Sequence, residues 1–178
     1  MFIFNISNNY RIINYNYFIL MKTAKINEET AKQLYPNASP ELKSILEDTF
    51  GKSMFLPIEE KINSFEDALK ASGRPEVPEF DCVPEDLIPF FKATYRCVVI
   101  AEAFNQGKRF DIYNQKQERY FPFFENNGSA SAFGLSGADS VDTDSDAGSG
   151  SRLSFLDWEL ARAAGTKFKN EFRDMLSL

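Results

Sequence analysis

Residues 95–104 form the most apolar stretch of the chain, and they lie inside a longer helical pattern over residues 84–106. Leu87, Phe91 and Tyr95 fall on one helical face, and the apolar residues that follow widen this stripe. A helix that is apolar this far round belongs at the centre of a core. Pro89 either bends the helix or marks its true start, and Gly107 ends it. The other elements must therefore cover this helix.

Three shorter helices are predicted upstream from paired start and stop signals. A side-chain oxygen before each helix can accept a hydrogen bond from the first turn, and a glycine after a helix allows a left-handed ending. Residues 74–84 carry three prolines and several acids, which indicates an extended connection. The signals are Asn27 before residues 28–34, Ser39-Pro40 and Gly51 around residues 40–50, and Ser64 and Gly73 around residues 65–72.

The C-terminal part is predicted to begin with two strands joined by a long loop. Aromatic residues over 118–124 indicate a strand, in which Pro122 favours an edge position or a bulge. Residues 126–150 are rich in Gly, Ser and Asp and too long for a hairpin turn, so they are predicted as a functional or disordered loop. Residues 151–155 are predicted as the second strand.

One last helix is predicted over residues 158–176, with Asp157 as its cap. Gly165 in its middle costs about 1 kcal/mol against alanine unless close packing requires it. The expected core-facing stripe repeats every four residues and consists of Leu160, Ala164, Phe168, Phe172 and Leu176.

These elements predict an α+β fold that is mainly helical. We expect one compact domain over residues 21–178, with a two-stranded antiparallel hairpin packed on helices and residues 126–150 as its flexible loop. Two strands alone are marginally stable, so the hairpin must pack on the last helix or the long helix, or recruit another strand.

Residues 1–20 differ in composition from the rest of the chain. Sixteen of them are Phe, Ile, Asn or Tyr, and Arg11 is their only charge. These four residue types have AT-rich codons, so we interpret the segment as translated upstream sequence, with Met21 as the true initiator, or as a disordered tail. A signal peptide and a membrane helix fit less well because Asn interrupts every apolar run. An edge strand is the remaining alternative.

Composition excludes several kinds of chemistry. The chain has no histidine, which removes His-based triads, His-ligated zinc and imidazole proton shuttles. With 26 acidic and 20 basic residues, it is a poor general ligand for nucleic acid. Cys97 lies on the apolar helix and is interpreted as structural, as is Cys82. We predict no catalytic residue, no metal site and no cofactor.

Three alternating acids, Asp142, Asp144 and Asp146, match the opening of an EF-hand calcium loop. The rest of that pattern fails, because Ala147 and Leu153 stand where Gly and a bidentate Glu are needed. We interpret this segment as a solvated loop.

The aromatic strand is the candidate contact surface. Alternation places Phe121 and Phe123 on one face and Tyr120 and Phe124 on the other, so one face meets the last helix and the other is available to a partner. The alternative is a sheet that is buried on both faces and offers no contact surface to a partner. A third possibility is base stacking beside the thin basic cluster Lys108, Arg109, Lys116 and Arg119. The candidate binding residues are Tyr120, Phe121, Phe123 and Phe124, with Phe133 and Leu135 of the loop.

The run that starts at Met21, together with INSFEDALKASG, VVIAEAFNQG, ERYFPFF and GSRLSF, forms a recognisable set of motifs. Over nearly all of residues 21–178 the chain resembles a group of small uncharacterised proteins encoded by Bacteroidales phages, prophages and related mobile elements. The resemblance implies that origin and no particular activity. Arg109-Phe110 and the Ser-, Asp- and Gly-rich loop depart from the group, which often has a tryptophan and a tyrosine-rich loop there.

These observations predict a cytoplasmic, non-enzymatic accessory protein of a phage or mobile element that binds another protein, from the host or the phage. A virion structural or assembly component is one alternative, and a nucleic-acid-associated protein that uses aromatic stacking is another. Nucleic acid is the less favoured partner, and no membrane association is expected. An enzyme of unrecognised type fits least well.

Overall fold

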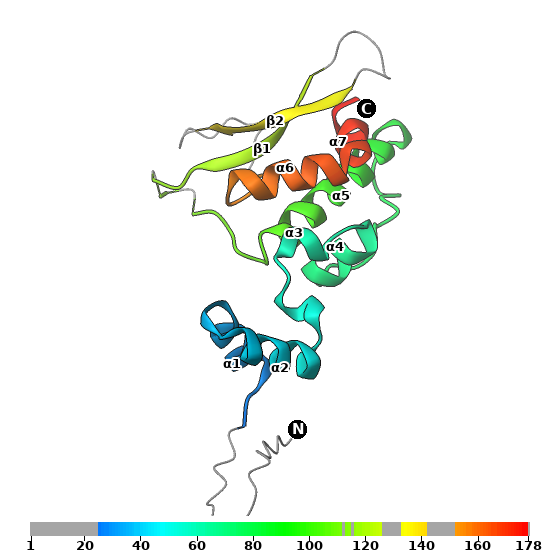
Figure 1. Ribbon diagram of the computed structural model, residues 1–178. Coiled ribbons are helices and arrows are strands. Elements are labelled where there is room, and N and C mark those ends of the chain that lie inside the picture. The colour runs from blue at the N-terminus through cyan, green and yellow to red at the C-terminus, as the bar shows by residue number, and fades with distance from the viewer. Residues whose placement is uncertain (1–24, 112, 115, 126–132, 142–151, 178) are drawn as a thin grey trace, which may run out of the picture. The chain divides into compact units, whose positions relative to one another are not determined.

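The computed structural model of the chain describes residues 25–111, 113–114, 116–125, 133–141 and 152–177 (Figure 1). Contacts divide the chain into two compact units, Met1–Leu56 and Pro57–Leu178. The hydrophobic core cluster draws all its described members from the second unit. The single domain expected over residues 21–178 stays a prediction. The interpretation of residues 1–20 falls outside the described residues.

The described part of the first unit consists of two helices and two short 3-10 turns. Helix α1 spans Glu28–Leu34 and α2 spans Pro40–Phe50, with turns η1 at Tyr35–Asn37 and η2 at Lys52–Phe55. The predicted caps are confirmed. Asn27 Oδ1 accepts from the Thr30 N–H at 2.8 Å, and Ser39 Oγ accepts from the Leu42 N–H at 3.3 Å. Gly51 ends α2 with a φ of 84°.

The second unit begins with two short helices, α3 at Ile58–Lys61 and α4 at Phe65–Ser72. The predicted capping box of α4 is confirmed. The Asp67 N–H donates to Ser64 Oγ at 3.1 Å, and the Ser64 N–H donates back to Asp67 Oδ2 at 3.0 Å. Gly73 ends α4 in the left-handed conformation, as its position predicts.

The long apolar helix α5 spans Ile88–Phe104, after the 3-10 turn η3 at Glu85–Leu87. Pro89 sits in its first turn, so the proline marks the start of the helix and does not bend it. Helices α4, α6 and α7 all contact α5, as expected for the central core helix. Its last residue, Phe104, is fully buried and meets the rings of Phe155 and Phe168 edge-on.

The sheet has two antiparallel strands, β1 at Arg119–Glu125 and β2 at Gly134–Val141, and helix α6 contacts both (Figure 1). This confirms the α+β class and the hairpin packed on helices. Phe123 lies opposite Gly137 and Phe124 opposite Leu135, so the register shifts between them and one residue of β2, Ser136, is extra. Such a bulge bends a strand and increases its twist.

The position of the second strand differs from the prediction. β2 lies inside residues 126–150, which the sequence predicts as a loop, whereas Phe155 makes only an isolated bridge to Tyr120 at the other edge of β1. Continuing that antiparallel pairing would bring Leu153 opposite Pro122, which has no N–H to donate. The proline therefore explains why the described residues 152–155 do not extend the sheet. Residues 126–132 and 142–151 lie outside the described part.

The predicted C-terminal helix is two helices, α6 at Trp158–Lys167 and α7 at Lys169–Ser177. They are separated at Phe168, whose φ of −115° and ψ of 30° leave the helical region. A four-residue stripe keeps to one face only while the helix is unbroken. The stripe is buried through Phe172, but Leu176 is 60% exposed, so its predicted place in the core is wrong.

Gly165 of α6 lies in close contact with the sheet. A Cβ atom at this position would lie 2.6 Å from Pro122 Cβ and 2.7 Å from Leu135 Cδ1. The sequence allowed a glycine in the middle of this helix only where close packing requires it, and the contacts of α6 with the sheet supply that requirement.

Among the helices that the structure describes, none combines the length and apolar character that crossing a bilayer demands.

Candidate functional site

The six predicted contact residues are divided between the core and the surface. Tyr120 and Phe124 of β1 pack against the core cluster, and Phe124 stacks on Phe133 with ring centroids 4.7 Å apart. Leu135 pairs with Phe124 across the sheet and is half-buried, as is Phe121. Phe123 is 49% exposed and is the most accessible ring of the six. One face of β1 is therefore used for folding, and the surface ring lies on the other.

An apolar groove of about 200 Å³ lies beside β1 and is here called the β1–α7 groove. Sequence analysis did not single out Leu153 and Met175 as contact residues, and it placed Leu176 in the core. The signal that could have pointed to Leu176 is its position at the very end of the stripe, where a helix has least cover. The groove is lined by Phe121, Pro122, Phe124, Leu153, Phe172, Met175 and Leu176.

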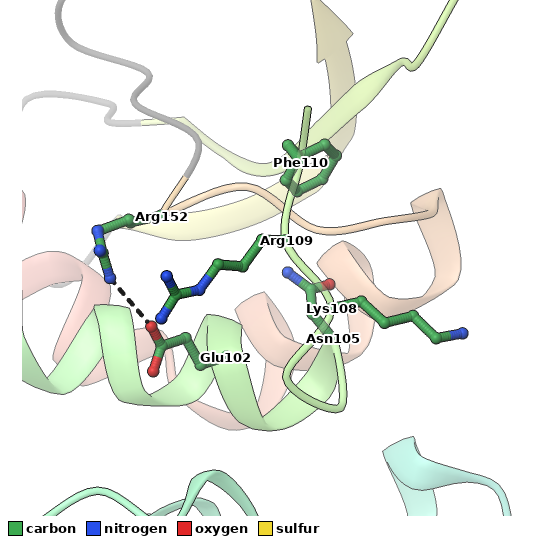
Figure 2. A pocket seen from close by; sticks show the side chains of 6 residues that line it. All are labelled: Glu102, Asn105, Lys108, Arg109, Phe110 and Arg152. Carbon is green, nitrogen blue, oxygen red and sulfur yellow. Dashed lines mark hydrogen bonds and ion pairs between the residues drawn. The ribbon is translucent and has the colours of Figure 1, made fainter. Parts of the chain in front are cut away.

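A second, polar cavity of about 90 Å³ lies at the C-terminal end of α5 and is here called the α5 pocket (Figure 2). Its centre is Glu102, whose carboxylate accepts two hydrogen bonds from Arg74, at 2.6 Å from Nε and 2.7 Å from Nη2. Arg152 Nη1 adds a contact of 3.2 Å to Glu102 Oε1. The pocket is lined by Glu102, Asn105, Lys108, Arg109, Phe110 and Arg152.

The electrostatics of the α5 pocket follow from this arrangement. The hydrogen bonds from Arg74 lower the pKa of Glu102, and the charges of Arg152 and Arg109 lower it further. Glu102 is thus held as a carboxylate surrounded by three guanidinium groups. Sequence analysis missed the site because Arg74 and Arg152 are 28 and 50 residues from Glu102.

The basic cluster considered for base stacking is not a single surface. Arg119 is only 2% exposed, whereas Lys116 is exposed and Lys108 and Arg109 line the α5 pocket. Among the described residues, Arg119 is buried and Tyr120 packs against the core, so the exposed basic residues do not form one continuous face with that ring.

The two cysteines differ in environment, and the structural interpretation of Cys97 agrees with its position. Cys97 is fully buried in α5, and burial raises the pKa of its thiol to about 12, with a further contribution from the charge of Glu171. Cys82 is exposed. Because the thiolate is the reactive species, only Cys82 is available for modification in the folded protein.

Labelling the native protein with a thiol-specific reagent is therefore expected to modify one cysteine quickly and the second only on unfolding. The number of labelled thiols, counted spectroscopically before and after adding denaturant, measures this. The Cys82→Ser variant is the control and should lose the fast reaction. Two fast thiols in the native protein would contradict the burial of Cys97.

Within the described residues, no three carboxylate or thiol side chains gather closely enough to hold a metal ion. The alternating acids Asp142, Asp144 and Asp146 lie outside the described residues, so the calcium-loop pattern receives no structural account.

Comparison of the chain with protein-family models, with curated proteins and with solved structures found no match.

Proposed function

We propose that the protein is a non-enzymatic accessory protein of a phage or related mobile element, which acts in the cytoplasm by binding another protein from the host or the phage. The motifs of residues 21–178 support the origin. The free thiols of Cys82 and Cys97 agree with a reducing compartment. The observation that carries the binding proposal is the β1–α7 groove, because Leu176 in its lining is exposed. Phe123 is also exposed, and it lies on β1, the strand that supplies Phe121, Pro122 and Phe124 to the groove.

The chemistry of the groove suits an apolar segment of a partner protein. Phe172 and Leu176 both belong to α7; Phe172 is buried and Leu176 is exposed, so this side of the groove has one side chain fixed in the core and one open to solvent. Met175 adds a flexible, polarisable side chain that can adapt to different shapes. Burying apolar surface contributes about 25 cal/mol per Å², and a few anchors inserted in such pockets supply most of the energy of typical interfaces.

A substitution at the rim of the groove tests this proposal. Leu176→Ser removes an exposed apolar side chain without opening the core, and we expect it to weaken partner binding about tenfold, or about 1.4 kcal/mol. The partner is first identified by comparing what the wild-type protein and the variant capture from host and phage lysates. Its affinity is then measured by calorimetry with the purified proteins.

The matched control is Leu87→Ser, which removes a 41% exposed leucine that lies outside the groove in the same unit. This variant should bind the partner as the wild type does. Equal affinity of both serine variants for the captured partner would contradict the proposed site, and both must keep the wild-type melting temperature for the comparison to count.

Assembly into a virion structure is the second candidate, and the sheet supports it. β1 lies between β2 and the Phe155 bridge, while β2 pairs with no other strand among the described residues. Open strand edges are ready templates for pairing with another chain. Light scattering separates the candidates, because an assembly component forms oligomers as its concentration rises and a dedicated binder of another protein stays monomeric.

A further inference from the structure

We propose that the α5 pocket binds a phosphate-type dianion, either inorganic phosphate or a phosphate monoester, held between Arg109 and Arg152. This inference does not depend on the β1–α7 groove or on the protein-binding proposal. It rests on the charge balance of the pocket, the way its walls are fixed, and its size.

The pocket carries more positive than negative charge. Arg74 pairs with Glu102 from outside the lining and compensates its negative charge, which leaves the positive charges of Arg109 and Arg152 uncompensated. Lys108 also lines the pocket, but its side chain points away from Glu102. Arg74 already uses both carboxylate oxygens, and Arg152 shares Oε1 at the longer distance of 3.2 Å. This local excess of positive charge contrasts with the net charge of −6 of the whole chain.

The two arginines available for a ligand are Arg109 and Arg152. Arg109 is exposed and makes no hydrogen bond to the described residues, although its charge acts on Glu102. The Arg152 side chain is 59% exposed, so its contact with Glu102 is weakly held. Figure 2 shows both side chains pointing toward Glu102 from different segments, whereas Lys108 points away. Both guanidinium groups can therefore reach an anion placed beside Glu102.

The walls of the pocket are fixed by buried contacts. Asn105 is buried, and its Nδ2 donates to the Ser154 carbonyl at 2.8 Å while its Oδ1 accepts from the Leu156 N–H at 3.0 Å. These bonds hold the segment of Arg152 against the end of α5. Phe110, also buried, anchors the segment of Arg109. The arginines thus emerge from ordered backbone, which lowers the entropy lost on binding.

The C-terminus of α5 would repel an anion if its carbonyls were free, because that end of a helix carries partial negative charge. The following N–H groups satisfy several of these carbonyls. Asn105 donates to Ala101, Gln106 to Ala103, and Gly107 to the backbone carbonyl of Glu102 at 3.0 Å. The repulsion is therefore reduced, and the guanidinium charges dominate the pocket.

The ligand class follows from charge and shape. A dianion matches the two uncompensated positive charges of the arginines. A tetrahedral oxyanion has enough acceptor oxygens to bridge two guanidinium groups, whereas the two oxygens of a carboxylate are already used by one guanidinium group. The volume of about 90 Å³ admits one such group and excludes a base or sugar from the pocket. Any remainder of a monoester would extend into solvent.

Titration of the full chain with inorganic phosphate, at constant ionic strength maintained with chloride, tests the proposal. Calorimetry is expected to show one saturable site. Arg109→Ala and Arg152→Ala should each weaken phosphate binding at least tenfold. Lys116→Ala, which removes an exposed positive charge outside the pocket, should leave it unchanged. Equal weakening in all three variants would show general charge attraction and overturn the site, as would the absence of saturation at tens of millimolar phosphate.

Further variants and a second ligand help to interpret the phosphate titration. Arg109→Lys and Arg152→Lys preserve charge and replace the alanine variants if those fail to fold, and each should still weaken binding through loss of the guanidinium fork. Tighter binding of O-phosphoserine than of phosphate would identify a monoester as the ligand, and equal or weaker binding would identify the free ion.

Discussion

Replacing Phe104 with alanine is expected to lower the free energy of unfolding by about 3–5 kcal/mol. Phe104 is fully buried at the end of α5, with ring centroids 6.0 Å from Phe155 and 6.1 Å from Phe168. These partners come from the segment that pairs with β1 and from the junction of α6 and α7. Removing the ring leaves a cavity that three separate segments would have to close.

Urea unfolding followed by circular dichroism measures this effect. Phe90→Ala is the matched control, because Phe90 lies on the same helix and is exposed. We expect that variant to lose less than about 1 kcal/mol. Similar losses in the two variants would contradict the placement of the core around the C-terminal half of α5.

Replacing Gly165 with alanine is expected to destabilise the protein by about 1–3 kcal/mol. Helix propensity alone predicts the opposite sign, a gain of about 1 kcal/mol in a helix interior. The added Cβ would lie 2.6 Å from Pro122 Cβ and 2.7 Å from Leu135 Cδ1, and β1 and β2 would have to move away from α6. The sign of the change therefore tests the close approach of helix and sheet.

A double-mutant cycle with Leu135→Ala makes the test specific. Truncating Leu135 removes one of the two close atoms, so Gly165→Ala should cost less in that background, with a coupling of at least about 0.5 kcal/mol. Thr166→Ala, at the next and exposed position of α6, is the control and should change stability by no more than about 0.5 kcal/mol. A stabilising Gly165→Ala would show that sheet and helix lie further apart.

The candidate sites could be predicted from the sequence only in part. The aromatic strand was visible as ERYFPFF, but which of its rings reach the surface depended on the packing of Tyr120 and Phe124 against the core. The β1–α7 groove also required Leu153 and Met175, which no local pattern connects with β1. The α5 pocket joins Arg74, Glu102 and Arg152 across long separations in the chain, so its charge balance has no sequence signature.

The sequence by itself determined the starts of α1, α2, α4 and α6 and the identity of the central helix α5. The caps at Asn27, Ser39, Ser64 and Asp157 each accept a hydrogen bond from the N–H three residues ahead, so every contact needed lies within one helical turn. The apolar character of α5 is equally local information. These interactions form in the same way wherever the helix lies in the fold.

Only the tertiary structure decided the second strand and the break at Phe168. The β2 segment, GLSGADSV, contains little that favours a strand, and its conformation depends on pairing with β1 and packing on α6. At Phe168 an unbroken stripe would have continued the helix, but the buried ring meets Phe104 of α5 and the chain turns there. Strand pairing and core contacts join residues far apart in the chain, so their outcome is not encoded in any single segment.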